Sequence, residues 1–365
     1  MKRMMNNKAI IDELNKSKAL SQAQWVQLLS TADESDRRYA AQLARSIADD
    51  IFGKKVYIRG IVEFSNYCRN DCYYCGIRCS NRAAQRYRLS AEEILACCDE
   101  GRALGFMTFV LQSGEDRHYT TGEMCAIVSA IKARHPDCAV TLSLGEMPRA
   151  DYQALFDAGA DRYLLRHETA NAAHYARLHP VNLSLQNRLE CLRALKDIGY
   201  QTGCGMMIGS PYQSDACLAE DMLFIKEFEP HMVGVGPFLP HRDTPFKEMP
   251  AGSFEKTLLV LSLIRIMLPH TLLPATTALG TIHPFGREEG IKAGANVVMP
   301  NLSPTAVRKK YLLYDNKICT GDESAQCVNC LESRLKKIGY HIEKGRGDYA
   351  RVASKEERKK KKEEW

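Results

Sequence analysis

The run Val56-Tyr-Ile-Arg-Gly-Ile-Val-Glu-Phe64 is followed after three residues by Cys68-Arg-Asn-Asp-Cys72-Tyr-Tyr-Cys75-Gly76. The first part has the apolar, β-branched composition of a buried strand. The second places three thiols at the spacing C-x3-C-x2-C. Three thiolates can bind three irons of a cubane cluster and leave the fourth iron without a protein ligand. An open iron can bind and reduce another molecule, so this loop is a candidate active site.

Short β-rich runs alternate with longer amphipathic stretches along most of the chain. Eight runs have the composition of strands: 56–64, 107–112, 139–144, 162–167, 202–208, 232–238, 272–278 and 295–299. Helical patterns lie between them, at 91–104, 122–134, 185–198, 217–228 and 254–268. The first of these helices begins with a capping box, Ser90-Ala-Glu-Glu93. Eight strand–helix units over about 245 residues predict an α/β fold, the (β/α)8 TIM barrel. A doubly wound sheet is the competing architecture, but its nucleotide-binding form carries a Gly-rich turn where this chain has cysteines.

The barrel is expected to be one of four parts of the chain. Residues 1–55 are interpreted as an N-terminal helical extension, in which Ser21 is an N-cap. The barrel takes residues 56–303, and a C-terminal extension with a second group of cysteines takes residues 304–350. Residues 351–365 are expected to be a disordered basic tail.

The composition favours a reducing compartment. The 365 residues are 45% hydrophobic and include 14 cysteines, and no apolar segment follows the N-terminal charges as it would in a secretory signal. The most apolar stretch, Leu258–Met267, is interrupted by Arg265 and is too short to cross a bilayer. We therefore expect a cytoplasmic protein with no membrane partner, whose clustered thiols are metal ligands rather than disulfides.

The formal net charge is +6, and the end of the chain contains the run Lys359–Lys362. A lysine run can bind nucleic acid. Here it is mixed with four glutamates, and no aromatic residues alternate with the basic ones as single-strand binding would require. We interpret it as a solvated end and expect no nucleic-acid partner.

The cysteines also allow a closed site. With Cys79 as a fourth ligand the pattern becomes C-x3-C-x2-C-x3-C, which suits a structural zinc ion or a four-cysteine electron-transfer cluster. The open cluster is favoured because the loop follows a strand on the predicted catalytic face of the barrel, and because Tyr74 precedes the last cysteine. Further polar residues end later strands on the same face: Gln112-Ser-Gly-Glu115, Ser143, Glu146, Arg166–Glu168, Thr276 and Thr277.

Arg166 stands in an otherwise apolar strand, where a charge is costly unless it is paired. We interpret it as part of an anion site. Its neighbour His167 should point to the opposite face of the strand. We expect His167 to be a hydrogen-bonded packing residue rather than a ligand.

The spacing C-x3-C-x-aromatic-C resembles the signature of the radical S-adenosylmethionine (SAM) superfamily. In that superfamily a [4Fe–4S] cluster binds the amino and carboxylate groups of SAM and cleaves its sulfonium bond reductively, giving methionine and a 5′-deoxyadenosyl radical. The resemblance places Tyr74 in the cofactor-binding loop. It also makes Gln112, Ser113, Gly114 and Glu115 a variant of the Gly-Gly-Glu element that grips the methionine ammonium group.

Three further runs, 142–146, 162–171 and 274–281, closely resemble the HydE family of [FeFe]-hydrogenase maturases, and the resemblance extends over about residues 10–345. It implies that Glu168 and Arg188 contact SAM and that Met207 and Ile208 line its adenine. It also implies a set of residues facing the substrate: Thr141, Ser143, Arg166, Thr276, Thr277 and Tyr314. Arg166 and Tyr314 join the three cysteines as candidate catalytic residues.

The resemblance also implies the substrate and the partners. The substrate would be a small mononuclear iron complex with carbon monoxide, cyanide and cysteine ligands, made by the companion maturase HydG. The product would be assembled on HydF, and a flavodoxin or ferredoxin would supply electrons. Cys319, Cys327 and Cys330 would hold a second iron–sulfur cluster.

Two alternatives stay open. The first is a relative of methylornithine synthase or biotin synthase that acts on an amino acid or a small organic acid. The second is a non-catalytic iron–sulfur or zinc protein.

Overall fold

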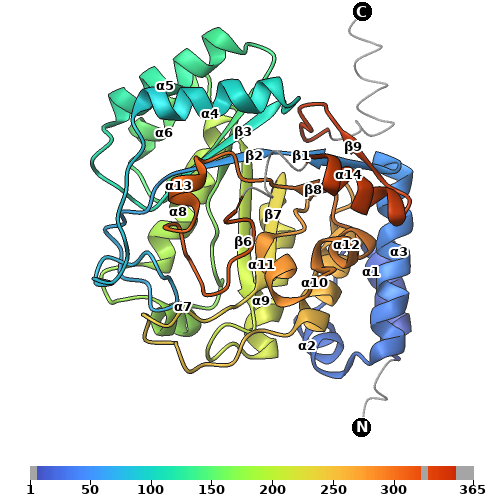
Figure 1. Ribbon diagram of the computed structural model, residues 1–365. Coiled ribbons are helices and arrows are strands. Elements are labelled where there is room, and N and C mark those ends of the chain that lie inside the picture. The colour runs from blue at the N-terminus through green and yellow to red at the C-terminus, as the bar shows by residue number, and fades with distance from the viewer. Residues whose placement is uncertain (1–5, 322–327, 351–365) are drawn as a thin grey trace, which may run out of the picture.

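The chain folds as a closed parallel barrel with an outer layer of helices, seen in a computed structural model that describes residues 6–321 and 328–350 (Figure 1). The strands are β1 (Lys55–Ile58), β2 (Gly60–Ser65), β3 (Thr108–Ser113), β4 (Ala139–Ser143), β5 (Arg162–Leu164), β6 (Gln201–Ile208), β7 (Met232–Pro237), β8 (Val297–Val298) and β9 (His341–Glu343). The helices between the first seven strands are α4 (Ala91–Ala103), α5 (Thr121–Arg134), α6 (Arg149–Asp157), α7 (Ala172–Leu178), α8 (Leu185–Ile198) and α9 (Asp215–Phe228). The remaining helices are α1 (Asn7–Ser17), α2 (Gln22–Thr31), α3 (Glu34–Phe52), α10 (Phe254–Met267), α11 (Thr277–Ile282), α12 (Gly286–Lys292), α13 (Thr305–Arg308) and α14 (Val328–Lys337). The tail predicted for 351–365 lies outside the described residues, as does Cys327.

The barrel is built from six strands in sequence order, β2 to β7, each parallel to the next. Isolated parallel bridges join Met232 to Leu272, Pro274 to Val297 and Ile61 to Asn301, which closes the ring between β7, β8 and β2. The predicted first strand is divided into β1, which pairs with β8 and β9, and β2. The predicted (β/α)8 barrel is confirmed.

The predicted strand 272–278 is mostly wrong. Only Leu272 and Pro274 make bridges, and helix α11 begins at Thr277. Pro274 has no N–H to donate to a ladder. The Thr276 side chain instead accepts a hydrogen bond from the Leu279 N–H and caps the helix. Thr276 and Thr277 therefore lie at a helix N-terminus and not at the end of a regular strand.

Local helix signals were reliable. Ser21 and Ser90 both form the predicted capping boxes, at α2 and α4. Helices α1 to α3 pack against α9 and α10 on the outside of the barrel, and Leu14 and Trp25 are among their fully buried side chains. In the described ranges, no helix has both the length and the apolar character needed to cross a membrane.

The end of the predicted C-terminal extension closes the floor of the barrel. Arg162, the first residue of β5, is fully buried and donates to Asp348 Oδ1 (2.6 Å) and to the Arg346 carbonyl (2.8 Å). The Tyr349 N–H donates to Gln201, the first residue of β6 (2.8 Å). Since these contacts fall on the first residues of strands, residues 346–349 cover the end of the barrel opposite to the active-site face.

Candidate active site

The cysteine loop follows β2 and is fixed by backbone hydrogen bonds to two other parts of the catalytic face. The Arg69 N–H donates to the Glu115 carbonyl after β3, and the Tyr73 N–H donates to the Leu178 carbonyl at the end of α7, both over 3.0 Å. The three cysteines of the motif are half-buried. The loop therefore has a defined shape at the carboxyl ends of the strands, where barrel active sites lie.

The surroundings of the Cys72 and Cys75 thiols disfavour their ionisation. Burial, reinforced by Cys68, raises the pKa of the Cys75 thiol to about 12. Burial also raises the pKa of Cys72, and Cys75 and Cys68 add to the effect. These shifts disfavour three uncompensated thiolates, and iron ions would compensate them because metal ions bind thiolate and release its proton. The donor set thus fits a cluster held by Cys68, Cys72 and Cys75.

Cys79 differs from the three cysteines of the motif. Its side chain is exposed, and its N–H donates to the Asn70 carbonyl (2.9 Å). Within residues 6–321 and 328–350, no three Cys, His, Asp or Glu side chains converge on one metal ion.

Arg188 and Glu168 lie beside the cysteine loop. After burial and the neighbouring thiols, the next influences on the pKa of Cys72 are Arg188, which lowers it, and Glu168, which raises it. Arg188 comes from α8, is buried, and its Nε lies 2.7 Å from Glu146 Oε1. Glu168 has a left-handed backbone (φ 65°), and its N–H donates to the Gly205 carbonyl (3.0 Å). A left-handed conformation is strained for a glutamate and is common at functional sites.

Tyr74 packs in a small apolar cluster with Met207. The cluster also contains Leu178, Phe238 and Phe246, and Tyr73 and Met249 lie against it. Ile208 belongs to the main core instead and is fully buried. Because successive residues of a strand point to opposite faces, the two side chains predicted to line the adenine are separated, and only Met207 joins Tyr74.

The side chains of the element Gln112–Glu115, at the end of β3, form hydrogen bonds with neighbouring residues. Glu115 accepts hydrogen bonds from Arg69 Nε (2.8 Å) and from the Glu146 N–H (2.9 Å). Gln112 Nε2 donates to the Tyr311 hydroxyl (3.2 Å), and Ser113 Oγ donates to the Gly114 carbonyl (2.7 Å). The element thus connects the cysteine loop to β4.

Gly114 is the point of closest approach to the cysteines. A Cβ atom there would lie 2.2 Å from the Tyr67 carbonyl oxygen and 2.7 Å from Cys68 Cβ. Gly114→Ala should therefore move the loop, cost about 1–3 kcal/mol of stability as other overpacking changes do, and lower the iron and sulfide bound after anaerobic reconstitution. Gly122→Ala is the matched control, because its nearest atom is 4.0 Å away. Wild-type iron content in Gly114→Ala would contradict this account of the loop.

Deeper in the barrel, donors without acceptors gather on one face. Thr141 of β4 lies opposite Arg162 of β5, so their side chains point to the same face of the sheet. Ser143 lies two residues after Thr141 and Arg166 four residues after Arg162, so alternation places both on that face. Thr141 Oγ1 and Arg166 Nε are buried and have no hydrogen-bond partner, and Arg166 Nη2 lies 3.2 Å from Glu168 Oε2. Buried polar groups are normally satisfied, so these groups fit a ligand that accepts hydrogen bonds.

His167 takes the opposite face, as predicted. Its Nδ1 accepts from the Gly205 N–H (3.2 Å), which leaves the proton on Nε2, 3.4 Å from Asp221 Oδ1. Phe224 of α9 lies against the ring at 4.8 Å. The packing role predicted for His167 is confirmed.

Tyr314 and the second cysteine set lie in the segment after α13. Tyr314 is hydrogen-bonded to Thr281 of α11, and burial raises its pKa. Cys319 Sγ accepts from Arg287 Nη2 (2.9 Å), and Cys330 is exposed on α14. Since Cys327 lies outside the described residues, the set of three is incomplete in the structure.

The sequence did not predict the ion pair between Glu63 and Lys317. Glu63 lies on β2, and its carboxylate is 2.5 Å from Lys317 Nζ with both side chains buried. Glu63 carried the same signal as Arg166, a charge inside an apolar strand. Lys317 had no comparable signal, because it lies in an irregular polar segment.

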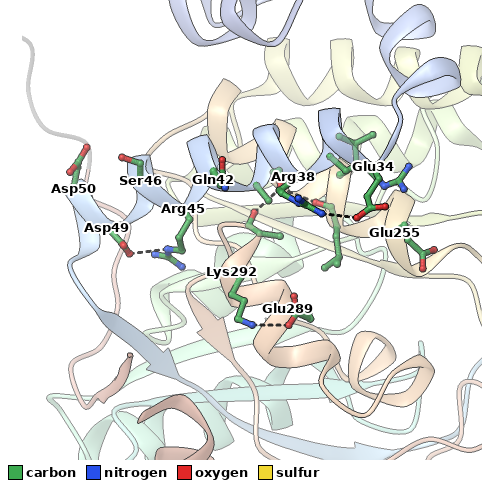
Figure 2. A pocket seen from close by; sticks show the side chains of 16 residues that line it. Glu34, Arg38, Gln42, Arg45, Ser46, Asp49, Asp50, Glu255, Glu289 and Lys292 are labelled. Carbon is green, nitrogen blue, oxygen red and sulfur yellow. Dashed lines mark hydrogen bonds and ion pairs between the residues drawn. The ribbon is translucent and has the colours of Figure 1, made fainter. Parts of the chain in front are cut away.

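A surface pocket of about 950 Å³ lies elsewhere, between α3, α10 and α12 (Figure 2). Arg38 pairs there with Glu34, Arg45 with Asp49, and Lys292 with Glu289. No cysteine lines it. It is therefore separate from the candidate active site.

Comparison with known proteins identifies relatives over most of the chain. Residues 62–225 match the model of the radical SAM superfamily. The chain is 46% identical over 311 residues to the [FeFe] hydrogenase maturase subunit HydE of Thermotoga maritima, which covers 85% of this chain and 88% of that protein. It is 28% identical over 314 residues to the 3-methylornithine synthase of Methanosarcina acetivorans, with 86% and 87% covered. The crystal structure of methylornithine synthase (PylB) superposes with a TM-score of 0.81 at 27% identity and covers 92% of this chain and 97% of that one.

The parallel barrel with three clustered thiols on its catalytic face thus defines a radical SAM enzyme. A [4Fe–4S] cluster and SAM are the cofactors that this superfamily implies. Within the superfamily, the chain belongs to the HydE family of [FeFe]-hydrogenase maturases.

Proposed function

We propose that the chain binds a [4Fe–4S] cluster through Cys68, Cys72 and Cys75 and cleaves SAM reductively during assembly of the two-iron subcluster of [FeFe]-hydrogenase. The observation that carries the proposal is the cysteine loop itself, whose three half-buried cysteines follow β2 and whose backbone N–H groups donate to the Glu115 and Leu178 carbonyls. The bound cofactors would supply a 5′-deoxyadenosyl radical.

Each neighbouring group has a role in this proposal. Arg188 would bind the carboxylate of SAM, for which its planar fork is suited. Glu168, with the element Gln112–Glu115, would hold the ammonium group. Tyr74 and Met207 would pack against the adenine, since they share one apolar cluster. Ile208 would contribute through its backbone only.

The substrate that we propose is a small Fe(CO)2(CN)–cysteine complex. Its cyanide and carboxylate groups accept hydrogen bonds, and the buried Thr141 Oγ1 and Arg166 Nε have no hydrogen-bond partner. Ser143, Thr276, Thr277 and Tyr314 would complete the substrate site. HydG would supply the complex, HydF would receive the product, and a flavodoxin or ferredoxin would be the reductant. Cys319, Cys327 and Cys330 would hold the second iron–sulfur cluster.

Paramagnetic resonance of the reconstituted, reduced protein tests the proposal. We expect a reduced [4Fe–4S] signal that changes shape when SAM is added, because SAM binds the open iron. The measurement is one anaerobic sample, recorded before and after the addition. A cluster signal that is indifferent to SAM, or zinc in place of iron, would indicate a closed site and contradict the proposal.

A second candidate function is an amino-acid synthase of the methylornithine type, favoured by the TM-score of 0.81. The two functions differ in their effect on hydrogenase. If the chain restores [FeFe]-hydrogenase activity to cells that lack their own HydE, the maturase function stands. Turnover of an amino acid without such rescue supports the second candidate.

A further inference from the structure

Residues 310–317, here called the strap, cross from the cysteine loop to the barrel strands (Figure 1, the segment after α13). The Gly76 N–H, directly after Cys75, donates to the Leu313 carbonyl (2.9 Å). Asn66 Nδ2, between β2 and Cys68, donates to the Lys310 carbonyl (2.7 Å). The strap is thus bonded to the cysteine loop on both sides of the motif.

The contact at Gly76 is too close for any side chain. A Cβ atom there would lie 2.2 Å from the Leu312 carbonyl oxygen. Tyr311 is buried, and its hydroxyl accepts from Gln112 Nε2 on β3. The strap therefore forms part of the wall around the cysteines.

One end of the strap is held by a buried ion pair. Lys317 Nζ lies 2.5 Å from Glu63 Oε1, and the two side chains are only 6% and 4% exposed. Lys317 also donates to the Tyr311 carbonyl (2.9 Å), and Asn301 donates to Glu63 Oε2 (2.9 Å). Near the same end, Asp315 accepts from Arg242 Nε (3.0 Å) in an exposed pair.

Burial of two charges costs desolvation, and removing one partner of a buried pair is strongly destabilising because the other charge is left unpaired. Here the pair fixes a segment that is hydrogen-bonded to the cysteine loop on both sides of the motif. Catalytic sites that generate reactive intermediates need covers to exclude water and other reactants.

We propose that Glu63 and Lys317 are positioning residues whose ion pair holds the strap closed over the cysteine loop and shields the cluster. The inference rests on the proposed function only in that the loop carries an iron–sulfur cluster. In this proposal the strap serves the site of Cys68, Cys72 and Cys75, although Cys319 of the second set follows the strap directly in the chain.

The test compares the reconstituted wild-type protein with Lys317→Met and with the double variant Glu63→Gln/Lys317→Met. The double variant leaves no unpaired buried charge, so it carries the test if the single variant does not fold. In both we expect the cluster absorbance to bleach about tenfold faster in air, because the strap should open more often without the ion pair. A tenfold rise in the open fraction corresponds to about 1.4 kcal/mol. Limited proteolysis should cut the strap faster as well. Lys336→Met is the control, because this lysine lies in the same extension and is 67% exposed.

Wild-type bleaching and wild-type proteolysis in a folded double variant would overturn the proposal. Faster bleaching without faster cleavage of the strap would also overturn it, because the pair would then act on the cluster by another route. A wild-type cluster that does not respond to SAM would defeat the proposed function but would leave the comparison of bleaching rates interpretable.

Discussion

Cys72→Ala is expected to reduce the formation of 5′-deoxyadenosine from SAM to background. Cys72 is the middle thiol of the motif and the one on which the charges of Arg188 and Glu168 both act. Its loss leaves two protein ligands for the cluster, which cannot hold a cubane with one open iron. The measurement is chromatographic, on anaerobically reconstituted and reduced protein, with iron content determined on the same sample.

Cys79→Ala is the informative companion to this variant. Its thiol is exposed, and the open-cluster interpretation does not use it. We expect the iron content and the 5′-deoxyadenosine yield to stay near those of the wild type. If Cys79→Ala lost the cluster as Cys72→Ala does, the closed four-cysteine interpretation would replace the open cluster. Wild-type formation of 5′-deoxyadenosine by Cys72→Ala would contradict the role of Cys72 as a cluster ligand.

Features that depend on neighbours in sequence were predicted well. The capping boxes at Ser21 and Ser90 need only residues three positions apart. The cysteine motif and the alternation of strands and helices are local patterns of the same kind. His167 was placed on the outer face by alternation alone, and its contacts with Asp221 and Phe224 agree.

Features that depend on distant partners were not predictable in this way. Whether the run 272–278 becomes a strand depends on the ladder that its neighbours offer, and Pro274 removes a donor from it. The pair of Glu63 and Lys317 joins residues 254 positions apart, and no local pattern connects them. Ile208 is a different case, because the resemblance assigned it to the adenine with Met207, and alternation along β6 places the two side chains in separate clusters.

The same reasoning applies to the floor of the barrel, where the largest stability effect is expected. Arg162 is fully buried, and its carboxylate partner is Asp348, 2.6 Å away and 186 residues later in the chain. Asp348→Asn would leave the guanidinium with neutral acceptors alone, the Arg346 carbonyl, Thr108 Oγ1 and Gln201 Oε1. Loss of one partner of a buried pair costs about 3–5 kcal/mol. Because Asp348 itself is 38% exposed, we expect about 2–3 kcal/mol here.

The stabilising effect of Asp348 is expected to decrease as the pH falls. Burial raises the pKa of Asp348, but hydrogen bonds from Arg346 and the charge of Arg162 outweigh burial and hold that pKa well below its usual value. A carboxylate with a depressed folded-state pKa stabilises the protein above its unfolded-state pKa of about 3.9, and the contribution is lost as the pH falls further. The gap in melting temperature between wild type and Asp348→Asn should therefore be constant from about pH 8 to pH 5 and narrow below about pH 4.

The control variant, Asp137→Asn, removes the exposed pair with Arg102 and should cost no more than about 1 kcal/mol. Equal melting temperatures for the Asp348 and Asp137 variants at pH 7 would show that the charge of Asp348 does not support the barrel floor.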